Sequence, residues 1–345
     1  MIAAEPLARQ TAEFPGWQRE LAEAVRDPIE LLDLVGLTPG QLGNGESAAS
    51  LREACLQFPL RVPRSFIARM RRGDPRDPLL RQVLAMGREL LPAPGYTNDP
   101  LQEADVREAP GLLHKYSGRA LLITTGACAV HCRYCFRRHY DYAQEQPDDG
   151  LPRWSAALSH VGANPHIEEI ILSGGDPLSL SNPRLHGLLR DLNALPQLQR
   201  IRIHTRTPIV LPSRVDQGLL DAFANIRDKL VIVVHSNHAA EIDEDTGTAL
   251  RQLQSVSTAL LNQSVLLAGI NDDTSVLAQL SARLFEFGAL PYYLHQLDPV
   301  AGAAHFAVPD ERALALAREL NDCLPGYLVP RLVREIPGKP SKTPL

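Results

Sequence analysis

From residue 119 onward, short apolar runs alternate with stretches of helical character, and this alternation restricts the fold more than any other feature. Strand–helix alternation of this kind predicts parallel strands joined by right-handed crossovers. About six such units predict an α/β fold, a partial (β/α)6-type barrel with its chemistry at the carboxyl ends of the strands. The apolar runs lie at 120–125, 168–173, 200–204, 229–235, 264–270, 291–297 and 328–334. Helical stretches lie at 183–194, 214–227, 247–261, 273–287 and 310–322.

Three cysteines follow the first apolar run in a C-x3-C-x2-C spacing, at Cys128, Cys132 and Cys135. A structural zinc site and an electron-transfer [4Fe-4S] cluster each take four protein ligands, so three thiolates would leave one iron of a cluster open to a small molecule. His131 or His139 could instead complete a zinc site. The thiols could also be plain buried groups, although an arginine-rich loop is a poor place for that.

Composition excludes several classes of protein. The chain has 345 residues, a net charge of −5 and no basic block, so bulk affinity for nucleic acid is not expected. No apolar run reaches the ~18 residues of a membrane span, and the first six residues lack the pattern of a signal peptide. An odd count of five cysteines argues against a disulfide framework and predicts a reducing, cytoplasmic location. Cys55 and Cys323 lie in helical stretches and are expected to be ordinary core residues.

Residues 1–110 are predicted to form a helical extension or cap without regular strands. Asp27-Pro28 and Asp77-Pro78 each place an N-cap and a first-turn proline before an apolar stripe. Residues 111–327 would form the barrel, and 328–345 the last strand and a Pro-rich tail that cannot continue a strand. No function for the extension follows from these patterns.

The segment Cys-Arg-Tyr-Cys-Phe-Arg-Arg at 132–138, placed after a first strand, resembles the lysine 2,3-aminomutase group of the radical S-adenosylmethionine (SAM) superfamily. Segments 58–67 and 77–83 resemble the branch that acts in β-lysylation of elongation factor P. The resemblance implies a radical SAM barrel, a [4Fe-4S] cluster on Cys128, Cys132 and Cys135, and SAM and pyridoxal 5′-phosphate (PLP) as further cofactors. It also implies an isomerase that converts L-α-lysine to β-lysine by 2,3-amino migration.

The resemblance also assigns cofactor-binding residues. The Ser-Gly-Gly-Asp turn would hold the amino group of SAM, although such a turn on its own is more often structural, and Gln263 would contact SAM as well. The basic run before the first strand would contact PLP. Lys342 would bind PLP covalently in preference to Lys339, because it lies in the family register after Pro337-Gly338. These residues are Lys115, Tyr116, Arg119, Ser173, Gly174, Gly175, Asp176, Gln263 and Lys342.

Three residues are assigned to the substrate by the same resemblance. Arg137 would clamp the α-carboxylate of lysine with its planar fork. Asp298 and Glu335 would receive the side-chain ammonium, with glutamate at 335 where free-lysine enzymes have aspartate. The roles of Arg138, His235 and His238 stay open.

L-lysine is the implied substrate, and elongation factor P with its lysyl ligase are the implied partners, with a homo-oligomer possible and neither nucleic acid nor membrane expected. Two alternatives stay open at this point. The chain could be a catabolic free-lysine 2,3-aminomutase, or a non-enzymatic binding module stabilised by zinc.

Overall fold

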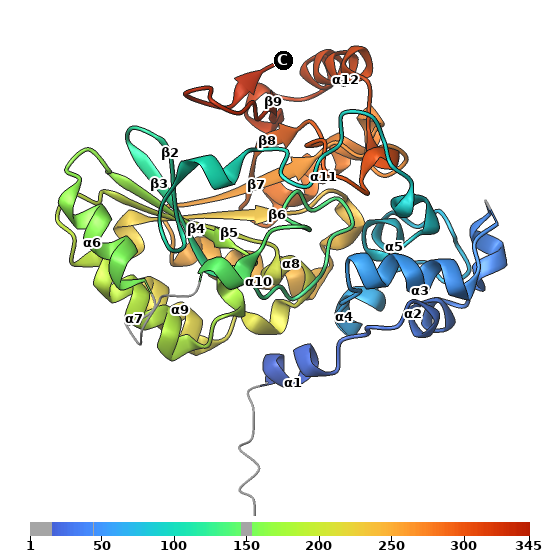
Figure 1. Ribbon diagram of the computed structural model, residues 1–345, viewed down its shortest axis with the longest axis horizontal. Coiled ribbons are helices and arrows are strands. Elements are labelled where there is room, and N and C mark those ends of the chain that lie inside the picture. The colour runs from blue at the N-terminus through green and yellow to red at the C-terminus, as the bar shows by residue number, and fades with distance from the viewer. Residues whose placement is uncertain (1–15, 44, 146–153) are drawn as a thin grey trace, which may run out of the picture.

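The computed structural model describes residues 16–43, 45–145 and 154–345. Within these residues, ten strands form one sheet and follow one another in chain order (Figure 1). The first six residues, which carry the signal-peptide expectation, lie outside the described part. Within that part, the central strands are mutually parallel: β3 (Arg119–Thr125), β4 (Glu169–Gly174), β5 (Arg200–Thr205), β6 (Leu230–His235), β7 (Ala259–Val265), β8 (Leu290–His295) and β9 (Arg331–Arg334).

At least one helix separates each consecutive pair of these parallel strands, which confirms the predicted partial (β/α)6 barrel, and a second, short helix, α8 (Thr207–Val210), also lies between β5 and β6. The helices are α6 (Ser155–Ala163), α7 (Asn182–Asn193), α9 (Gln217–Ala224), α10 (Glu244–Ser255), α11 (Thr274–Glu286) and α12 (Asp310–Cys323). Strand residues such as Ile170, Ile201 and Ile232 pack with helix residues such as Leu188 and Leu250 in one buried core. Among the described residues no pairing joins β1 to β10, so the barrel is open.

Short antiparallel strands extend both edges of the sheet. β1 (Arg107–Ala109) and β2 (Leu112–Tyr116) form a hairpin beside β3, and β10 (Thr343–Pro344) pairs with β9. β1 lies within the stretch that was expected to lack strands, and three residues are too few to show a pattern. The tail does not continue β9, which ends at Arg334, but it turns back, and Thr343 pairs with Arg334 in a short strand that the sequence did not predict.

The predicted strand at 264–270 was wrong, since β7 ends at Val265 and the predicted helix 247–261 ends at Ser255. Asn262 and Ser264 are buried polar residues on β7, and both bond the backbone of Ser236 on the neighbouring chain segment. Polar residues at these positions made the sequence at 259–265 look unlike a buried strand. In the fold, hydrogen bonds to Ser236 satisfy their polar groups, so the strand can be buried there.

The N-terminal helices pack to one side of the barrel (Figure 1): α1 (Gly16–Ala22), α2 (Pro28–Val35), α3 (Ala48–Gln57), α4 (Arg64–Ile67) and α5 (Pro78–Val83). Asp27 and Asp77 cap α2 and α5 as predicted, each accepting two backbone N–H groups. Their apolar core, with Leu32, Phe66 and Leu80 at its centre, also contains Ala129 and Val130 of the cysteine loop. The extension therefore packs directly on the cysteine loop, while the division at residues 110 and 327 stays a prediction.

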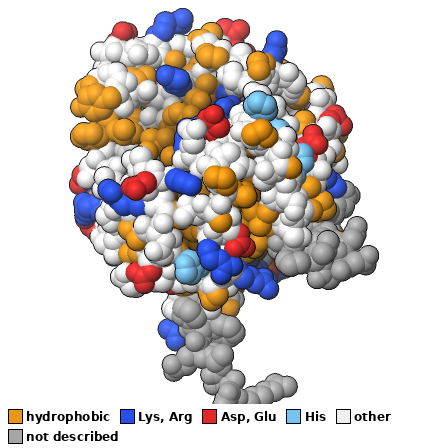
Figure 2. All heavy atoms as spheres, turned by 90° about the vertical axis from the view of Figure 1, so that its left-hand side faces the viewer, with side chains coloured by type: hydrophobic (Ala, Val, Ile, Leu, Met, Phe, Trp, Pro, Cys, Tyr) orange, Lys and Arg blue, Asp and Glu red, His pale blue; other side chains and the backbone are white. Residues whose placement is uncertain are grey.

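The surface carries charges of both signs. Figure 2 shows Lys and Arg side chains interspersed with Asp and Glu on one face, together with scattered hydrophobic side chains. In the described part of the chain, no helix combines the length and hydropathy that crossing a membrane requires.

Candidate active site

A cavity of about 380 Å³ lies at the carboxyl ends of the parallel strands, and every residue that the resemblance assigned to a cluster, a cofactor or the substrate contributes to its wall. The wall is formed mainly by residues of β2, of β3 and the loop after it, of the carboxyl-terminal parts of β4 to β8, and of the C-terminal tail. The predicted site residues in the wall are Lys115, Tyr116, Arg119, Cys128, Cys132, Cys135, Arg137, Ser173, Gly174, Gly175, Asp176, Gln263, Asp298, Glu335 and Lys342.

The cysteine loop is held in place by the N-terminal extension. Arg61 donates to the carbonyl of Cys128 (3.1 Å) and accepts a bond from the His131 N–H (3.0 Å), while the Arg133 N–H donates to the carbonyl of Gln82 (2.9 Å). Arg133 forms a fully buried ion pair with Glu89 (2.6 Å). The conformation of the loop therefore depends on residues more than 40 positions before it.

The three thiols suit a cluster that ligates each through a different iron. Burial raises the pKa of Cys128 well above its ordinary value and that of Cys135 to about 11, so a cation is needed to hold these groups as thiolates. Among residues 16–43, 45–145 and 154–345, no three His, Cys, Asp or Glu side chains are arranged to hold a single metal ion. The donor set fits a [4Fe-4S] cluster with one open iron.

The two glycines after β4 are required by the backbone of the cysteine loop. A Cβ on Gly174 would lie 2.7 Å from the Thr125 carbonyl oxygen, and one on Gly175 would lie 2.3 Å from that of Ala127. Gly174 also has a φ of +114°, which L side chains rarely adopt. These glycines set the distance between the Gly-Gly-Asp segment and the cysteines.

The Asp176 carboxylate is already occupied by the protein. It accepts bonds from the Thr205 hydroxyl (2.7 Å) and from the backbone N–H groups of Leu178, Arg206 and Thr207. Asp176 therefore orients the loop after β5, and the Ser173 hydroxyl and exposed backbone remain to face a ligand.

Glu103 lines the cavity as well, although no sequence pattern indicated it as a site residue. Its carboxylate accepts two bonds from the Arg137 fork (2.6 and 2.9 Å) and lies 3.3 Å from Lys115 Nζ. Burial alone would raise the pKa of Glu103, but Arg137 and Lys115 lower it below its usual value. An isolated glutamate in an irregular segment carries no pattern, so only the fold identifies it. The remaining Nη1 of Arg137 donates to the Ser173 hydroxyl (3.0 Å).

Glu335 joins the predicted PLP-binding groups. Its carboxylate accepts bonds from Lys342 Nζ (2.7 Å), Lys115 Nζ (3.1 Å) and the Tyr116 hydroxyl (3.3 Å). Burial alone would raise the pKa of Glu335, but Lys342 and Lys115 hold it well below its usual range. The Arg119 guanidinium lies over the Tyr116 ring, 4.1 Å from its centroid. The fold thus brings together four groups suited to the phosphate and aldehyde of PLP.

The tail presents one of its two lysines to this cluster. β10 returns along β9 and directs Lys342 into the cavity, whereas Lys339 is exposed and lies outside its wall.

Two further predicted residues complete the wall. Gln263 projects from β7 on the face opposite the buried Asn262 and Ser264. Burial, with Glu335 nearby, raises the pKa of Asp298 to about 7.

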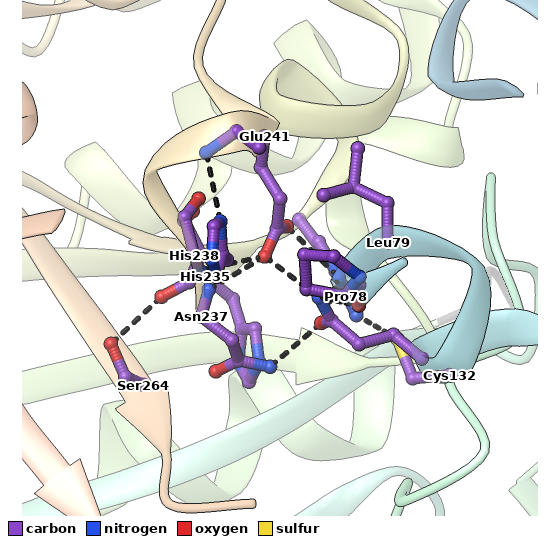
Figure 3. Close-up of polar contacts among 12 residues, drawn as sticks. Pro78, Leu79, Cys132, His235, Asn237, His238, Glu241 and Ser264 are labelled. Atoms are coloured by element: carbon purple, nitrogen blue, oxygen red, sulfur yellow. Dashed lines mark hydrogen bonds and ion pairs between the residues drawn. The ribbon is translucent and has the colours of Figure 1, made fainter. Parts of the chain in front are cut away.

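The roles of Arg138, His235 and His238 were left open by the sequence, and in the structure each of them bonds another residue of the protein. Arg138 is buried and pairs with Glu89 (2.8 Å). His238 caps a short helical turn by accepting from the Ala240 N–H (3.0 Å), as Figure 3 shows. His235 lines the cavity and bonds the Tyr134 hydroxyl through Nε2 (2.9 Å), and its burial lowers its pKa well below the ordinary value.

No protein-family model matches the chain. Proteins named L-lysine 2,3-aminomutase are similar to it over nearly its whole length. That of Escherichia coli (strain K12) is 50% identical, over 95% of this chain and 94% of the relative. That of Haemophilus influenzae is 43% identical, over 99% and 98%, and that of Clostridium subterminale is 32% identical, over 97% and 78%.

Among solved structures, a radical SAM methyltransferase from Sphaerobacter thermophilus superposes with a TM-score of 0.45 and 18% identity, over 65% of this chain and 68% of the other. That similarity is too low to support an argument. The sequence similarity, which spans both the extension and the barrel, shows that the chain belongs to the lysine 2,3-aminomutase family.

Proposed function

We propose that this chain is a radical SAM, PLP-dependent isomerase that converts L-α-lysine to β-lysine by moving the amino group from C2 to C3. The observation that carries the proposal is that three thiols, a lysine–tyrosine–arginine group and an arginine–carboxylate set all line one cavity. Separate sites for these groups would not permit one reaction. Family membership removes the zinc-stabilised binding module from consideration.

The cofactors supply the radical chemistry: the cluster and SAM when bound generate a hydrogen-abstracting radical, and PLP carries the migrating nitrogen. Cys128, Cys132 and Cys135 hold the cluster, and the segment Ser173 to Asp176, with Gln263, holds SAM beside it. Lys342 binds PLP, and Lys115, Tyr116 and Arg119 bind its phosphate.

Lysine is oriented by charge at its two ends. Arg137 receives the α-carboxylate, since a bidentate fork fixes both position and direction. Asp298 and Glu335 receive the side-chain ammonium. Arg137 is buried and both carboxylates are half-buried, which limits the access of water to these groups.

The resident carboxylates must exchange partners when ligands bind. Glu103 fills the Arg137 fork and Glu335 bonds both Lys115 and Lys342. A substrate carboxylate therefore competes with Glu103, and the PLP phosphate competes with Glu335. Before loading, the two carboxylates partly offset the positive charges of Arg137, Lys115 and Lys342.

For the biological role, we infer that the product serves β-lysylation of elongation factor P in the cytoplasm. Support comes from segments 58–67 and 77–83, which resemble that branch, and from Glu335, one methylene longer than the aspartate of free-lysine enzymes. A catabolic free-lysine mutase is the competing role.

The two roles are separated by giving the isolated product to elongation factor P and its lysyl ligase. We expect the ligase to attach this product faster than L-α-lysine, as followed by the mass of intact elongation factor P. Equal or slower attachment, together with rapid turnover of free lysine, would favour the catabolic role. The handedness of the product provides a second comparison.

A further inference from the structure

Arg206, which follows β5, lies buried against the cysteine loop. Its Nη1 donates to Cys132 Sγ (2.7 Å) and to the Tyr134 hydroxyl. Its Nη2 donates to Gln82 Oε1 (2.7 Å) and to Glu241 Oε2 (3.0 Å). One guanidinium therefore joins a cluster cysteine to a buried carboxylate.

Several parts of the chain hold Arg206 in place, and Figure 3 shows that Glu241, Asn237 and Cys132, which come from different segments, lie close together. The backbone N–H of Arg206 donates to Asp176 (2.7 Å), which fixes the main chain from which the side chain extends. Glu241 Oε1 accepts from the N–H groups of Asn237 (2.8 Å) and His238 (3.0 Å) and from Gln82 Nε2 (3.1 Å).

Gln82 belongs to α5 of the N-terminal extension, and its Nε2 also donates to the Pro78 carbonyl (3.0 Å). The extension therefore reaches a cluster ligand through a single intervening side chain, Arg206. A charge this well held cannot move away when the neighbouring sulfur gains electron density.

A buried cation beside a ligating sulfur has a defined electrochemical effect. Reduction adds negative charge to a cluster, and N–H donors and positive charge at its sulfurs stabilise the reduced form. Arg206 remains charged at any working pH because a guanidinium does not lose its proton in proteins. Its burial in a low-dielectric environment strengthens the interaction.

Resting on the proposed function, we propose that Arg206 is a positioning residue that orients Cys132 and raises the reduction potential of the cluster. Glu241 and Gln82 hold the guanidinium in that position. The N-terminal extension thus contributes to the electron-transfer step that starts the reaction, in addition to its packing.

The test is an anaerobic redox titration of the reconstituted full chain, followed by electron paramagnetic resonance, with iron content measured in parallel. Arg206→Met should lower the midpoint potential by at least about 59 mV, a tenfold fall in the reduction equilibrium constant. Arg206→Lys keeps the charge and one donor, so its shift should be smaller. Arg214→Met is the matched control, because Arg214 is also buried but bonds the carbonyls of Leu178 and Leu180 and pairs with the Asp216 carboxylate rather than with a cysteine.

For a second variant, we expect the midpoint potential to shift in the opposite direction. Glu241→Gln removes the negative charge that faces Arg206, so the potential should rise. Wild-type potential in an iron-loaded Arg206→Met, or equal shifts in Arg206→Met and Arg214→Met, would overturn the proposal. If Arg206→Met does not retain iron, wild-type potentials in both Arg206→Lys and Glu241→Gln would overturn it. Absence of a cluster from the wild type would instead contradict the proposed function.

Discussion

Five side chains of alternating charge cross the cavity from Arg137 to Lys342. The ion pairs run from Arg137 to Glu103, from Glu103 to Lys115, from Lys115 to Glu335 and from Glu335 to Lys342. Buried charges are tolerated only when paired, so this arrangement lets the protein fold before its ligands bind. Each ligand then replaces a resident partner of like charge.

Arg137 provides a test of substrate orientation. Arg137→Lys keeps the charge but loses the planar fork, so we expect the KM for lysine to rise at least tenfold, about 1.4 kcal/mol, with a smaller effect on kcat. Steady-state kinetics on lysine measure this. Arg138→Lys is the control, because Arg138 pairs with Glu89 outside the cavity wall. An unchanged KM in Arg137→Lys would remove Arg137 from the substrate site.

Asp298 provides a test of burial through the pH dependence of stability. Its pKa is raised from 3.8 to about 7, so between these values the folded chain holds a proton that the unfolded chain has released. The free energy of unfolding should therefore fall as pH rises through this window, by up to about 1.4 kcal/mol per unit. Asp298→Asn has no carboxyl group to titrate at this position, so its free energy of unfolding should not fall in this way. The variant should therefore become more stable than the wild type towards pH 7.

Urea unfolding of the cofactor-free protein at several pH values between 4 and 8, roughly the span in which carboxyls and histidines titrate, measures the effect. Asp310→Asn is the control. Because Arg334 lowers the pKa of Asp310, removing this carboxyl group should not raise the free energy of unfolding towards pH 7. If the free energy of unfolding varied with pH in the same way for the wild type and Asp298→Asn, the pKa of Asp298 would not be raised in the folded protein.

The cluster ligands are tested by iron content. Changing Cys128, Cys132 or Cys135 to alanine should remove iron and SAM cleavage together, because each thiolate ligates a different iron. Cys55→Ala and Cys323→Ala should retain iron, since Cys55 packs in the N-terminal core and Cys323 is exposed on α12. Equal loss of iron from Cys323→Ala would mean that the ligand set is wrong.

At the scale of elements, the strand–helix alternation predicted six of the seven parallel strands close to their observed bounds. β7 was misplaced because Asn262 and Ser264 find their partners on the preceding strand segment, which no local pattern reveals. β10 was missed because two residues of a Pro-rich tail become a strand only beside β9.

The tail element makes its own prediction. β10 directs Lys342 towards Glu335, so borohydride reduction in the presence of PLP should trap the cofactor on the peptide bearing Lys342. Lys342→Ala should abolish trapping and rearrangement while the iron content stays unchanged. Lys339→Ala is the matched control and should behave like the wild type, because Lys339 is exposed. An adduct on Lys339 or Lys115, located by mass spectrometry, would overturn the assignment.

At the scale of the whole molecule, the sequence located the site but not the reasons for its geometry. Cysteine spacing, the Gly-Gly-Asp turn and the tail lysine are local patterns, and their placement after strands predicted that they would meet. Glu103, Arg206 and Glu241 each bond a partner 34 or more positions distant in sequence, and no local pattern indicates these contacts. The role of the N-terminal extension in holding the cysteine loop likewise depends on tertiary contacts.

The central claim is that one cavity joins a cluster, SAM and PLP to rearrange lysine. The most direct measurement is anaerobic incubation of the reconstituted full chain with SAM, PLP, a reductant and L-lysine labelled with ¹⁵N at the α-amino group. Magnetic resonance of the product should show the label on C3, giving β-lysine, and omission of either SAM or PLP should prevent it. A protein with full iron content that cleaves SAM but leaves the label on C2 would contradict the account.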